Sequence, residues 1–389
     1  MSAVDFVVVG AGIAGASVAW QLSGRSSVLL LERETQPGYH STGRSAALFL
    51  EHYGPPQVQA LTRASRAFYE APPADFMPDP VLGPRGALYV ASAQQQAALE
   101  AAYAQARAHS QAVRWLEPAQ MRALVPCLRE EMVVAGFLDE NARDIDVNGL
   151  HQAFLRGLRQ RAAGAGESGG ASLRCGAEVV SLVHDAARAC WQVGLADGSR
   201  IAARHVVNAA GAWADEVAAM AGVARLELVP KRRSAFTFAA PEGVDARPWP
   251  AVMDVDDRFY FKPDAGQLLG SPANADPTTP HDVVPEELDV ATGIFHIEEY
   301  TTLRIRRPSR TWAGLRSFVA DGELVIGWDA PPAAGQPGFF WLAAQGGYGI
   351  QTAYGAGLLA RNLLLGEAVD VGLLAQGVQP ERLSPARLR

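Results

Sequence analysis

The feature that most constrains this chain is a glycine-rich turn close to its N-terminus. The apolar run DFVVV (5–9) predicts a buried parallel strand, and Gly10-x-Gly12-x-x-Gly15 and the helix-forming stretch ASVAWQLSG follow it. A second apolar run, SVLLLE, ends at Glu32, 22 positions after Gly10. The order of strand, turn, helix, strand and acid predicts a dinucleotide-binding unit in a Rossmann-like α/β domain.

The three glycines and the acid have separate physical roles in this prediction. Gly10 permits the tight turn, Gly12 lets backbone N–H groups approach the pyrophosphate, and Gly15 lets the helix lie close to the strand. The helix N-terminus adds partial positive charge at the phosphates. Glu32 would accept hydrogen bonds from ribose hydroxyls. The alternative is a glycine-rich turn between two ordinary elements.

Two later segments bear on which dinucleotide is bound. Residues 205–222 predict a strand, a small-residue turn and a helix, and residues 338–364 predict a strand, the turn GGYG (346–349) and a helix from about Ile350. Glycines at a strand end indicate close backbone approach. A helix N-terminus aimed at the N1 and C2 carbonyl of a flavin would stabilise the reduced ring, so these segments favour FAD over NAD. The alternative for 338–364 is a further strand–helix packing contact.

Composition excludes several classes of protein. A chain of 389 residues with 49% hydrophobic residues is typical of a globular enzyme with two domains or one large α/β domain with an insertion. A net charge of -7 argues against a nucleic-acid partner. Cys127, Cys175 and Cys190 are too dispersed for a disulfide framework or a metal site, so we expect no bound metal. With no signal peptide and no apolar run of about 18 residues or more, the prediction is a cytoplasmic protein without a transmembrane segment.

The pattern of predicted secondary structure changes after residue 228. Residues 229–316 carry alternating strand-like runs with Pro and Gly turns, which predict an antiparallel sheet. Its first run, VPKRRSAFTF, places Lys231, Arg232 and Arg233 at the start of a half-buried strand, which indicates that an anion lies opposite. Elsewhere, residues 92–111 predict a helix, and the Gly/Ser/Ala-rich stretch 161–174 predicts a surface loop.

Over nearly its whole length the chain resembles the FAD-dependent D-amino acid oxidase and dehydrogenase superfamily, and most closely the bacterial D-arginine dehydrogenases. The resemblance is strongest in GYHSTGRSAA (38–47), PKRRSAF (230–236), GSPANADP (270–277), TWAGLRSFVADG (311–322) and AAQGGYGIQT (343–352). It implies an α/β fold (α+β overall) in which an FAD-binding domain of discontinuous segments carries an inserted, mostly antiparallel substrate domain. The implied FAD-binding domain comprises residues 1–84, 145–228 and 317–389, and the substrate-binding domain comprises residues 85–144 and 229–316.

The resemblance also implies noncovalently bound FAD. In the family the HSTGRSA loop wraps the flavin, and His40 raises the alternative of a covalent flavin link that the most similar members lack. The positions expected to bind the cofactor are Gly10, Gly12, Ile13, Ala14, Gly15, Glu32, Arg33, Ser41, Thr42, Gly43, Arg44, Ser45, Ala46, Ala47, Leu48, Val179, Ala210, Gly211, Trp213, Gly346, Gly347, Tyr348, Gly349, Ile350 and Gln351.

By the same resemblance, Arg233 and Arg316 clamp the α-carboxylate of an amino acid beside the flavin. The planar fork of a guanidinium gives paired, charge-assisted hydrogen bonds that set orientation as well as charge. Tyr53 and Tyr260 match tyrosines that bind substrate and exclude water, while Arg232 is expected to be a surface cation. The expected catalytic residues are Tyr53, Tyr260, Arg233 and Arg316, and the expected substrate-binding residues are these four with Leu48, Ala87 and Gly347.

The implied reaction is oxidative deamination of D-amino acids. Hydride passes from the α-carbon to N5 of FAD, and the imino acid then hydrolyses to a 2-oxo acid and ammonia. A protein base is not required, because the amine can lose its proton to water on binding. The electron acceptor, whether a quinone, a carrier protein or oxygen, stays open.

Three positions depart from the D-arginine enzymes. Ala87 stands where those enzymes carry the acid that binds the substrate guanidinium, and Leu48 and Leu50 replace a His and a Thr. Burying an unpaired guanidinium is costly, so we expect neutral or apolar D-amino acids to be preferred over D-arginine. Glu51 could supply the missing charge, which would restore D-arginine activity. The sequence also leaves open an oxygen-using glycine- or sarcosine-type amine oxidase, a nicotinamide-dependent dehydrogenase and a non-catalytic flavin-binding protein.

Overall fold

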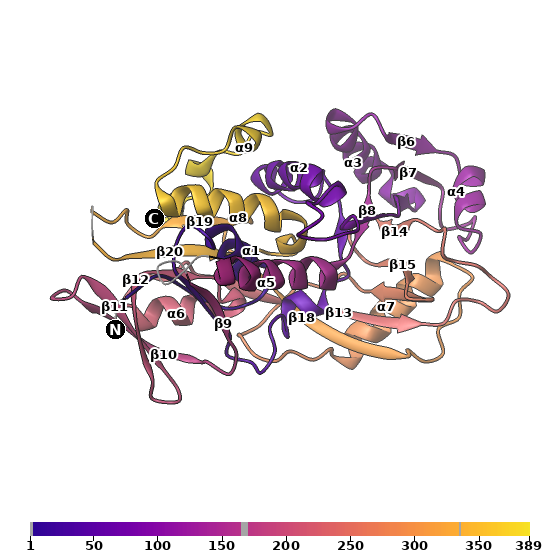
Figure 1. The fold of residues 1–389 in the computed structure, drawn as a ribbon. Coiled ribbons are helices and arrows are strands. Elements are labelled where there is room, and N and C mark those ends of the chain that lie inside the picture. The colour runs from indigo at the N-terminus through magenta and orange to yellow at the C-terminus, as the bar shows by residue number, and fades with distance from the viewer. Residues whose placement is uncertain (1–2, 165–169, 334–335) are drawn as a thin grey trace.

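The computed structural model describes residues 3–164, 170–333 and 336–389. One of its two large sheets has eight strands and lies at the left of Figure 1, where β10, β11, β12 and β20 are labelled. The N-terminal apolar run is at the centre of this sheet. The strands of this sheet are β1 (Val4–Val9), β2 (Val28–Leu31), β9 (Ala171–Arg174), β10 (Val179–Asp185), β11 (Cys190–Leu195), β12 (Arg200–Asn208), β19 (Val325–Trp328) and β20 (Gly338–Ala343). The order β9-β2-β1-β12-β20 is parallel throughout, whereas β19 and the β10–β11 hairpin add antiparallel strands.

Helices cover both faces of this sheet, which explains why its central strands are apolar without interruption. On one face, Val8 and Leu30 pack with α1 (Ile13–Leu22), α2 (Pro56–Glu70), α5 (Val147–Gly164) and α8 (Gly349–Leu365). The short helix α9 (Val371–Ala375) contacts α2. On the other face, Val7 and Leu31 pack with α6 (Ala214–Met220).

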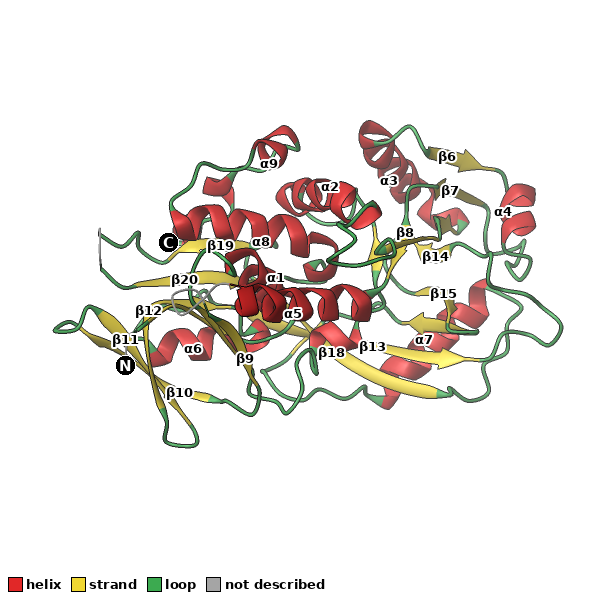
Figure 2. Cartoon of the chain, viewed as in Figure 1, coloured by secondary structure: helices red, strands yellow, loops and turns green. Residues whose placement is uncertain are grey.

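The second large sheet, at the right of Figure 2, has nine strands. Its strands pair antiparallel, apart from the parallel pair that β14 forms with β5. These strands are β5 (Ala87–Ala91), β6 (Val113–Leu116), β7 (Ala135–Asp139), β13 (Val229–Phe238), β14 (Ala251–Asp254), β15 (Tyr260–Asp264), β16 (Gln267–Ser271), β17 (Asp276–Pro277) and β18 (Arg310–Phe318). The accompanying helices are α3 (Gln96–His109), α4 (Pro118–Leu124) and α7 (Glu287–Tyr300). A small third sheet joins β3 (Leu48–Phe49), β8 (Arg143–Ile145) and β4 (Leu82–Pro84).

The predicted fold class, a Rossmann-like α/β domain with a mostly antiparallel second part, is confirmed. The predicted helix within 92–111 is confirmed as α3. The prediction of a loop at 161–174 is wrong at both ends, because 161–164 continue α5 and 171–174 form β9, while 165–169 lie outside the described residues. Strand β9 was missed because its identity comes from pairing with β2 rather than from its own composition. The domain boundaries stay a prediction.

None of the helices that the structure describes is long and apolar enough to cross a membrane.

Candidate active site

The glycine-rich turn has the close backbone contacts that the motif predicts. Gly10 has a φ of +99°, and a Cβ added there would lie 2.6 Å from the carbonyl oxygen of Ala209. A Cβ at Gly15 would lie 1.9 Å from the carbonyl oxygen of Gly10, so α1 could not approach β1 as it does. At Gly12 the nearest atom would be the hydroxyl oxygen of Thr42, at 3.2 Å. Only glycine therefore fits at Gly10 and Gly15 without a shift of the backbone.

Glu32 closes this turn from the end of β2. One carboxylate oxygen accepts a hydrogen bond from the backbone N–H of Ala11 at 3.0 Å, and the other accepts one from the N–H of Glu34 at 3.0 Å. The side chain is buried but lines the cleft described below. An ionised carboxylate has about four lone-pair sites, so two remain for the hydroxyls of a ribose.

His151 supports the same turn and was missed from the sequence. From α5 its Nε2–H donates to the carbonyl oxygen of Ala11 at 2.9 Å, and a Cβ added at Gly38 would lie 2.9 Å from its ring. Burial lowers the pKa of His151, which keeps the ring neutral. No local motif marks this histidine, because its partner lies 140 residues away in the chain.

The HSTGRSA loop ties the two sheets together. Thr42 accepts a hydrogen bond from the backbone N–H of Ile13 at the start of α1, at 3.0 Å. The hydroxyl of Ser41 donates to the carbonyl oxygen of Leu315 on β18, at 2.7 Å. The guanidinium of Arg44 donates to three backbone carbonyls, one of them on β18, and forms an ion pair with Asp282. The loop thus holds α1 beside β18.

A long cleft runs from the glycine-rich turn to β13 and β18. Most of the predicted cofactor residues line it: Gly10, Gly12, Ile13, Ala14, Glu32, Arg33, Ser41, Thr42, Arg44, Ser45, Ala46, Val179, Ala210, Gly211, Trp213, Gly346, Gly347, Gly349 and Ile350. Arg233, Tyr260 and Arg316 line the same cleft. The remaining predicted residues lie outside its lining: Gly15, Gly43, Ala47, Leu48, Tyr348 and Gln351, together with Tyr53 and Ala87.

Gln345 and Gly314 also line the cleft and were missed. Gln345 lies beside the GGYG turn, and its side-chain nitrogen is buried without a hydrogen-bond partner among the described residues. A buried donor without a protein acceptor suits a polar atom of a bound ligand. Gly314 lies directly opposite Arg233 in the strand register, which no local sequence signal reveals.

The register of β13 and β18 explains the cationic run. Lys231 pairs with Arg316, so Arg316 lies on the same face as Arg233, two residues further along β13. Within the described ranges, neither Arg233 nor Arg316 forms an ion pair, although the charge of the nearby Asp257 acts to raise the pKa of Arg233. Burial lowers the pKa of Arg233, and the positive charge of Arg316 lowers it further. Two partly buried cations that repel one another are stabilised when an anion binds between them.

Arg232 points to the opposite face and has protein partners. Its Nε lies 2.8 Å from a carboxylate oxygen of Asp289 on α7, and the guanidinium also forms ion pairs with Glu286 and Asp276. The anions opposite Arg232 are therefore acids of the protein, whereas Arg233 forms no ion pair in the described part of the chain.

Tyr53, Tyr260 and Tyr348 lie near Arg316. Burial acts to lower the pKa of Arg316, but the oxygens of Tyr53 and Tyr260 outweigh it and raise the pKa on balance. The ring of Tyr53 lies edge-on to that of Tyr348, with centroids 5.3 Å apart. A Cβ added at Gly347 would lie 2.8 Å from Nη1 of Arg316, so glycine lets the guanidinium lie against the backbone.

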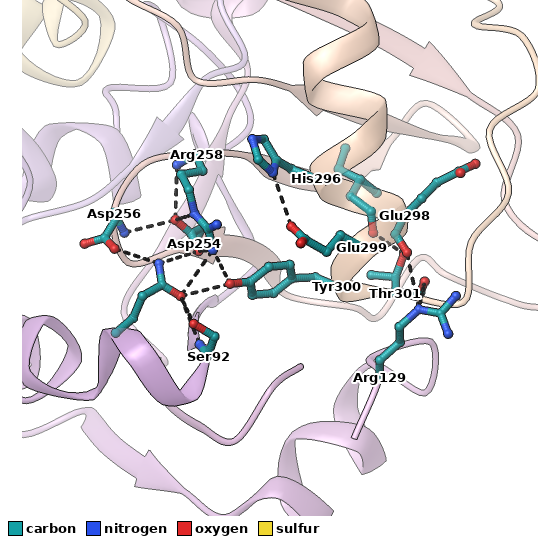
Figure 3. A network of polar contacts seen from close by, with 12 residues as sticks. Ser92, Arg129, Asp254, Asp256, Arg258, His296, Glu298, Glu299, Tyr300 and Thr301 are labelled. Carbon is teal, nitrogen blue, oxygen red and sulfur yellow. Dashed lines mark hydrogen bonds and ion pairs between the residues drawn. The ribbon is translucent and has the colours of Figure 1, made fainter. Parts of the chain in front are cut away.

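A polar network fixes the turn that leads into Tyr260. Figure 3 shows Asp254 at its centre, beside Arg258 and Tyr300. The buried carboxylate of Asp254 accepts hydrogen bonds from Nη2 of Arg258 at 3.0 Å and from the side chain of Gln95 at 2.9 Å. Because Arg258 lies two residues before Tyr260, this network orients the start of β15.

On the side away from the arginines, Tyr260 packs in a cluster of hydrophobic side chains. Leu50, Ala87 and Met253 are buried in one cluster with Tyr260, and Leu48 and Tyr53 pack against it. Glu51, which could have supplied a negative charge, lies 2.6 Å from Nε of Arg66. That carboxylate is already neutralised by a protein cation.

The comparisons with known proteins agree with this architecture. A family model described as "FAD dependent oxidoreductase" matches residues 5–363. The protein "FAD-dependent oxidoreductase domain-containing protein 1" of Bos taurus is 24% identical over 418 residues, which cover 93% of this chain and 81% of that protein. Mitochondrial dimethylglycine dehydrogenase of Mus musculus is 30% identical over 159 residues, which cover 40% of this chain and 17% of that protein.

Solved structures show the same fold. L-proline dehydrogenase from P. horikoshii superposes with a TM-score of 0.81 at 19% identity, covering 99% of this chain and 98% of that one. Glycine oxidase from Geobacillus kaustophilus superposes with a TM-score of 0.80 at 22% identity, covering 100% of this chain and 99% of that one.

Proposed function

Because the chain belongs to the DAO family of FAD dependent oxidoreductases, with FAD as cofactor, we propose that it oxidises the α-amine of amino acids whose carboxylate binds Arg233 and Arg316. The observation that carries the proposal is this pair of guanidinium groups, which share one face of adjacent strands, line the cleft and form no ion pair with a carboxylate among the described residues. A substrate carboxylate would supply the missing negative charge.

The residues of the chain would bind and orient the substrate. We assign the glycine-rich turn and the start of α1 to the pyrophosphate, Glu32 to a ribose, and the GGYG turn at the start of α8 to the ring of the cofactor. Bound FAD would accept the two electrons of the oxidation. Arg233 and Arg316 would hold the carboxylate, and the hydroxyls of Tyr53 and Tyr260 would orient the substrate and exclude water.

In the reaction the substrate amine, having lost a proton to water, is oxidised to an imine. Water then adds to the imine, which gives a 2-oxo acid and ammonia. No side chain needs to accept the α-proton, because hydrogen leaves the α-carbon as hydride.

We propose that the preferred substrates are neutral or apolar D-amino acids rather than D-arginine. The apolar cluster around Tyr260 and the neutralised Glu51 support this preference. A guanidinium placed against Ala87, Leu48 and Leu50 would lose its hydration without gaining a partner.

A second candidate is a glycine- or sarcosine-type amine oxidase. The names of relatives favour it, since dimethylglycine dehydrogenase and glycine oxidase both act on small amines with a carboxylate. An apolar cluster could equally accept an N-methyl group. In both candidates the carboxylate would bind the same two arginines.

The test is an anaerobic screen that follows bleaching of the flavin absorbance. D- and L-leucine, phenylalanine, methionine and arginine are compared with glycine, sarcosine and dimethylglycine, and air is then admitted to measure reoxidation by oxygen. We expect rapid bleaching with apolar D-amino acids and slow bleaching with D-arginine. Bleaching by none of these compounds, with the flavin still bound, would contradict the proposed function. Faster bleaching with sarcosine would favour the second candidate, and faster bleaching with D-arginine would contradict the substrate preference.

A further inference from the structure

On one of its two sides, strand β13 has no partner strand at Arg233, Ser234 and Ala235 in the part of the chain that the structure describes. On one side β13 pairs continuously with β18. On the other side it pairs with β16 through Phe236–Phe238 and with β17 through Lys231 and Arg232. Between these two partners the chain runs through the loop 272–275, so the backbone of Arg233 to Ala235 has no neighbouring strand there.

Asn274, in that loop, takes the place of the missing strand. Its side-chain oxygen accepts a hydrogen bond from the backbone N–H of Ser234 at 2.8 Å, and its backbone carbonyl accepts one from Nε of Arg233. Its side-chain nitrogen donates to Asp276 at 2.7 Å and to Asp289 at 3.1 Å. The side-chain amide of Asn274 thus both accepts and donates hydrogen bonds, and its backbone carbonyl binds the guanidinium of Arg233.

The groups around Asn274 hold it firmly. Asp289 accepts hydrogen bonds from Ser234 at 2.7 Å and from Arg232 at 2.8 Å. Burial acts to raise the pKa of Asp289, but these two donors outweigh it and hold the pKa below its usual value. Ala273 has a φ of +51°, a conformation that costs a non-glycine residue on the order of 1 kcal/mol and persists where the surroundings enforce it.

We propose that Asn274 is a positioning residue for substrate: it fixes Nε of Arg233 so that the two terminal nitrogens of the guanidinium face the carboxylate. The proposal rests on the proposed function. It also explains the adjacent arginines of the KRR run. Arg232 anchors the acids that hold Asn274, and Asn274 in turn orients Arg233. Arg232 and Arg233 lie on opposite faces of β13, yet both would contribute to the contact between Arg233 and the substrate carboxylate.

The experiment measures binding of acetate and benzoate to the FAD-loaded protein through the shift in flavin absorbance. We expect Asn274→Ala to weaken both carboxylates about 10-fold, with flavin content unchanged. In turnover, KM should rise by a similar factor while kcat changes less than 3-fold or so, since the weakened contact is that of Arg233 with the carboxylate, which is made in ground and transition states alike. Asn141→Ala is the matched control, because Asn141 is another loop asparagine with a side-chain hydrogen bond, at 3.1 Å to Ser110, and should bind carboxylates as wild type does.

Double variants separate positioning from a general effect on folding. In an Arg233→Lys background Asn274→Ala should have no further effect on carboxylate binding, since lysine has no Nε–H to hold. In an Arg316→Lys background the full 10-fold loss should persist. If Asn274→Ala does not fold, Asn274→Gln provides the same comparison, because it keeps the amide but displaces the loop carbonyl.

The outcomes distinguish the two proposals. Wild-type protein that binds FAD but neither carboxylate contradicts the proposed function. Wild-type protein that binds carboxylates, together with an Asn274 variant that binds them equally well, overturns the positioning role alone. A loss that is equally large in both lysine backgrounds also overturns it.

Discussion

Replacing Arg316 by methionine tests the carboxylate contact most directly. Methionine has a similar length and no charge, so the apolar packing of the side chain is largely kept. A hydrogen bond to a charged group contributes about 1.5–3 kcal/mol, and a bidentate contact supplies two. Since loss of Arg316 also removes its repulsion of Arg233, we expect a net loss of about 3 kcal/mol, or roughly 100-fold weaker carboxylate binding.

The assay is a titration of the FAD-loaded variant with benzoate, followed by steady-state turnover with the best amino acid of the screen. KM should rise steeply while the flavin stays bound, because the glycine-rich turn is untouched. Arg310→Met is the control, since Arg310 is an exposed arginine on the same strand. Benzoate affinity within 3-fold or so of wild type, in a folded and flavin-loaded Arg316→Met protein, would refute the reasoning.

Three further predictions concern backbone contacts and pH. Gly15→Ala should destabilise the fold by about 1–3 kcal/mol and reduce FAD content, measured by thermal unfolding and flavin absorbance, because its Cβ would clash with the carbonyl of Gly10; unchanged FAD content would contradict this. Gly347→Ala should weaken benzoate binding several-fold without loss of flavin, because its Cβ would displace the guanidinium of Arg316, and unaltered binding would speak against that contact. Burial and the neighbouring Arg204 lower the pKa of His205 to about 4. The unfolded chain binds this proton near pH 6.5, so the free energy of unfolding should fall by roughly 2–3 kcal/mol between pH 6.5 and 4, and urea titrations of His205→Asn should show a shallower fall.

The sequence by itself determined the nucleotide-binding half of the molecule. Gly10, Gly12, Gly15 and Glu32 lie within 22 positions of one another, and their roles depend on local geometry: a tight turn, a close helix and an acid at a strand end. Such features are encoded over short distances and can be read without the fold. The strand-like runs and the Pro and Gly turns after residue 228, which predict an antiparallel sheet, are also encoded over short distances.

Only the tertiary structure decided which polar groups lie together in the cleft. The sequence shows three adjacent cations, but the strand register and α7 separate them, with Arg232 bound to Asp289 and Arg233 left beside Arg316. Asn274 and His151 act through hydrogen bonds to segments 40 and 140 residues away, and neither belongs to a recognisable motif. The reason is physical: the function of a polar side chain depends on which partners burial brings within hydrogen-bonding distance, and a long-range pairing leaves no periodic signal in the chain.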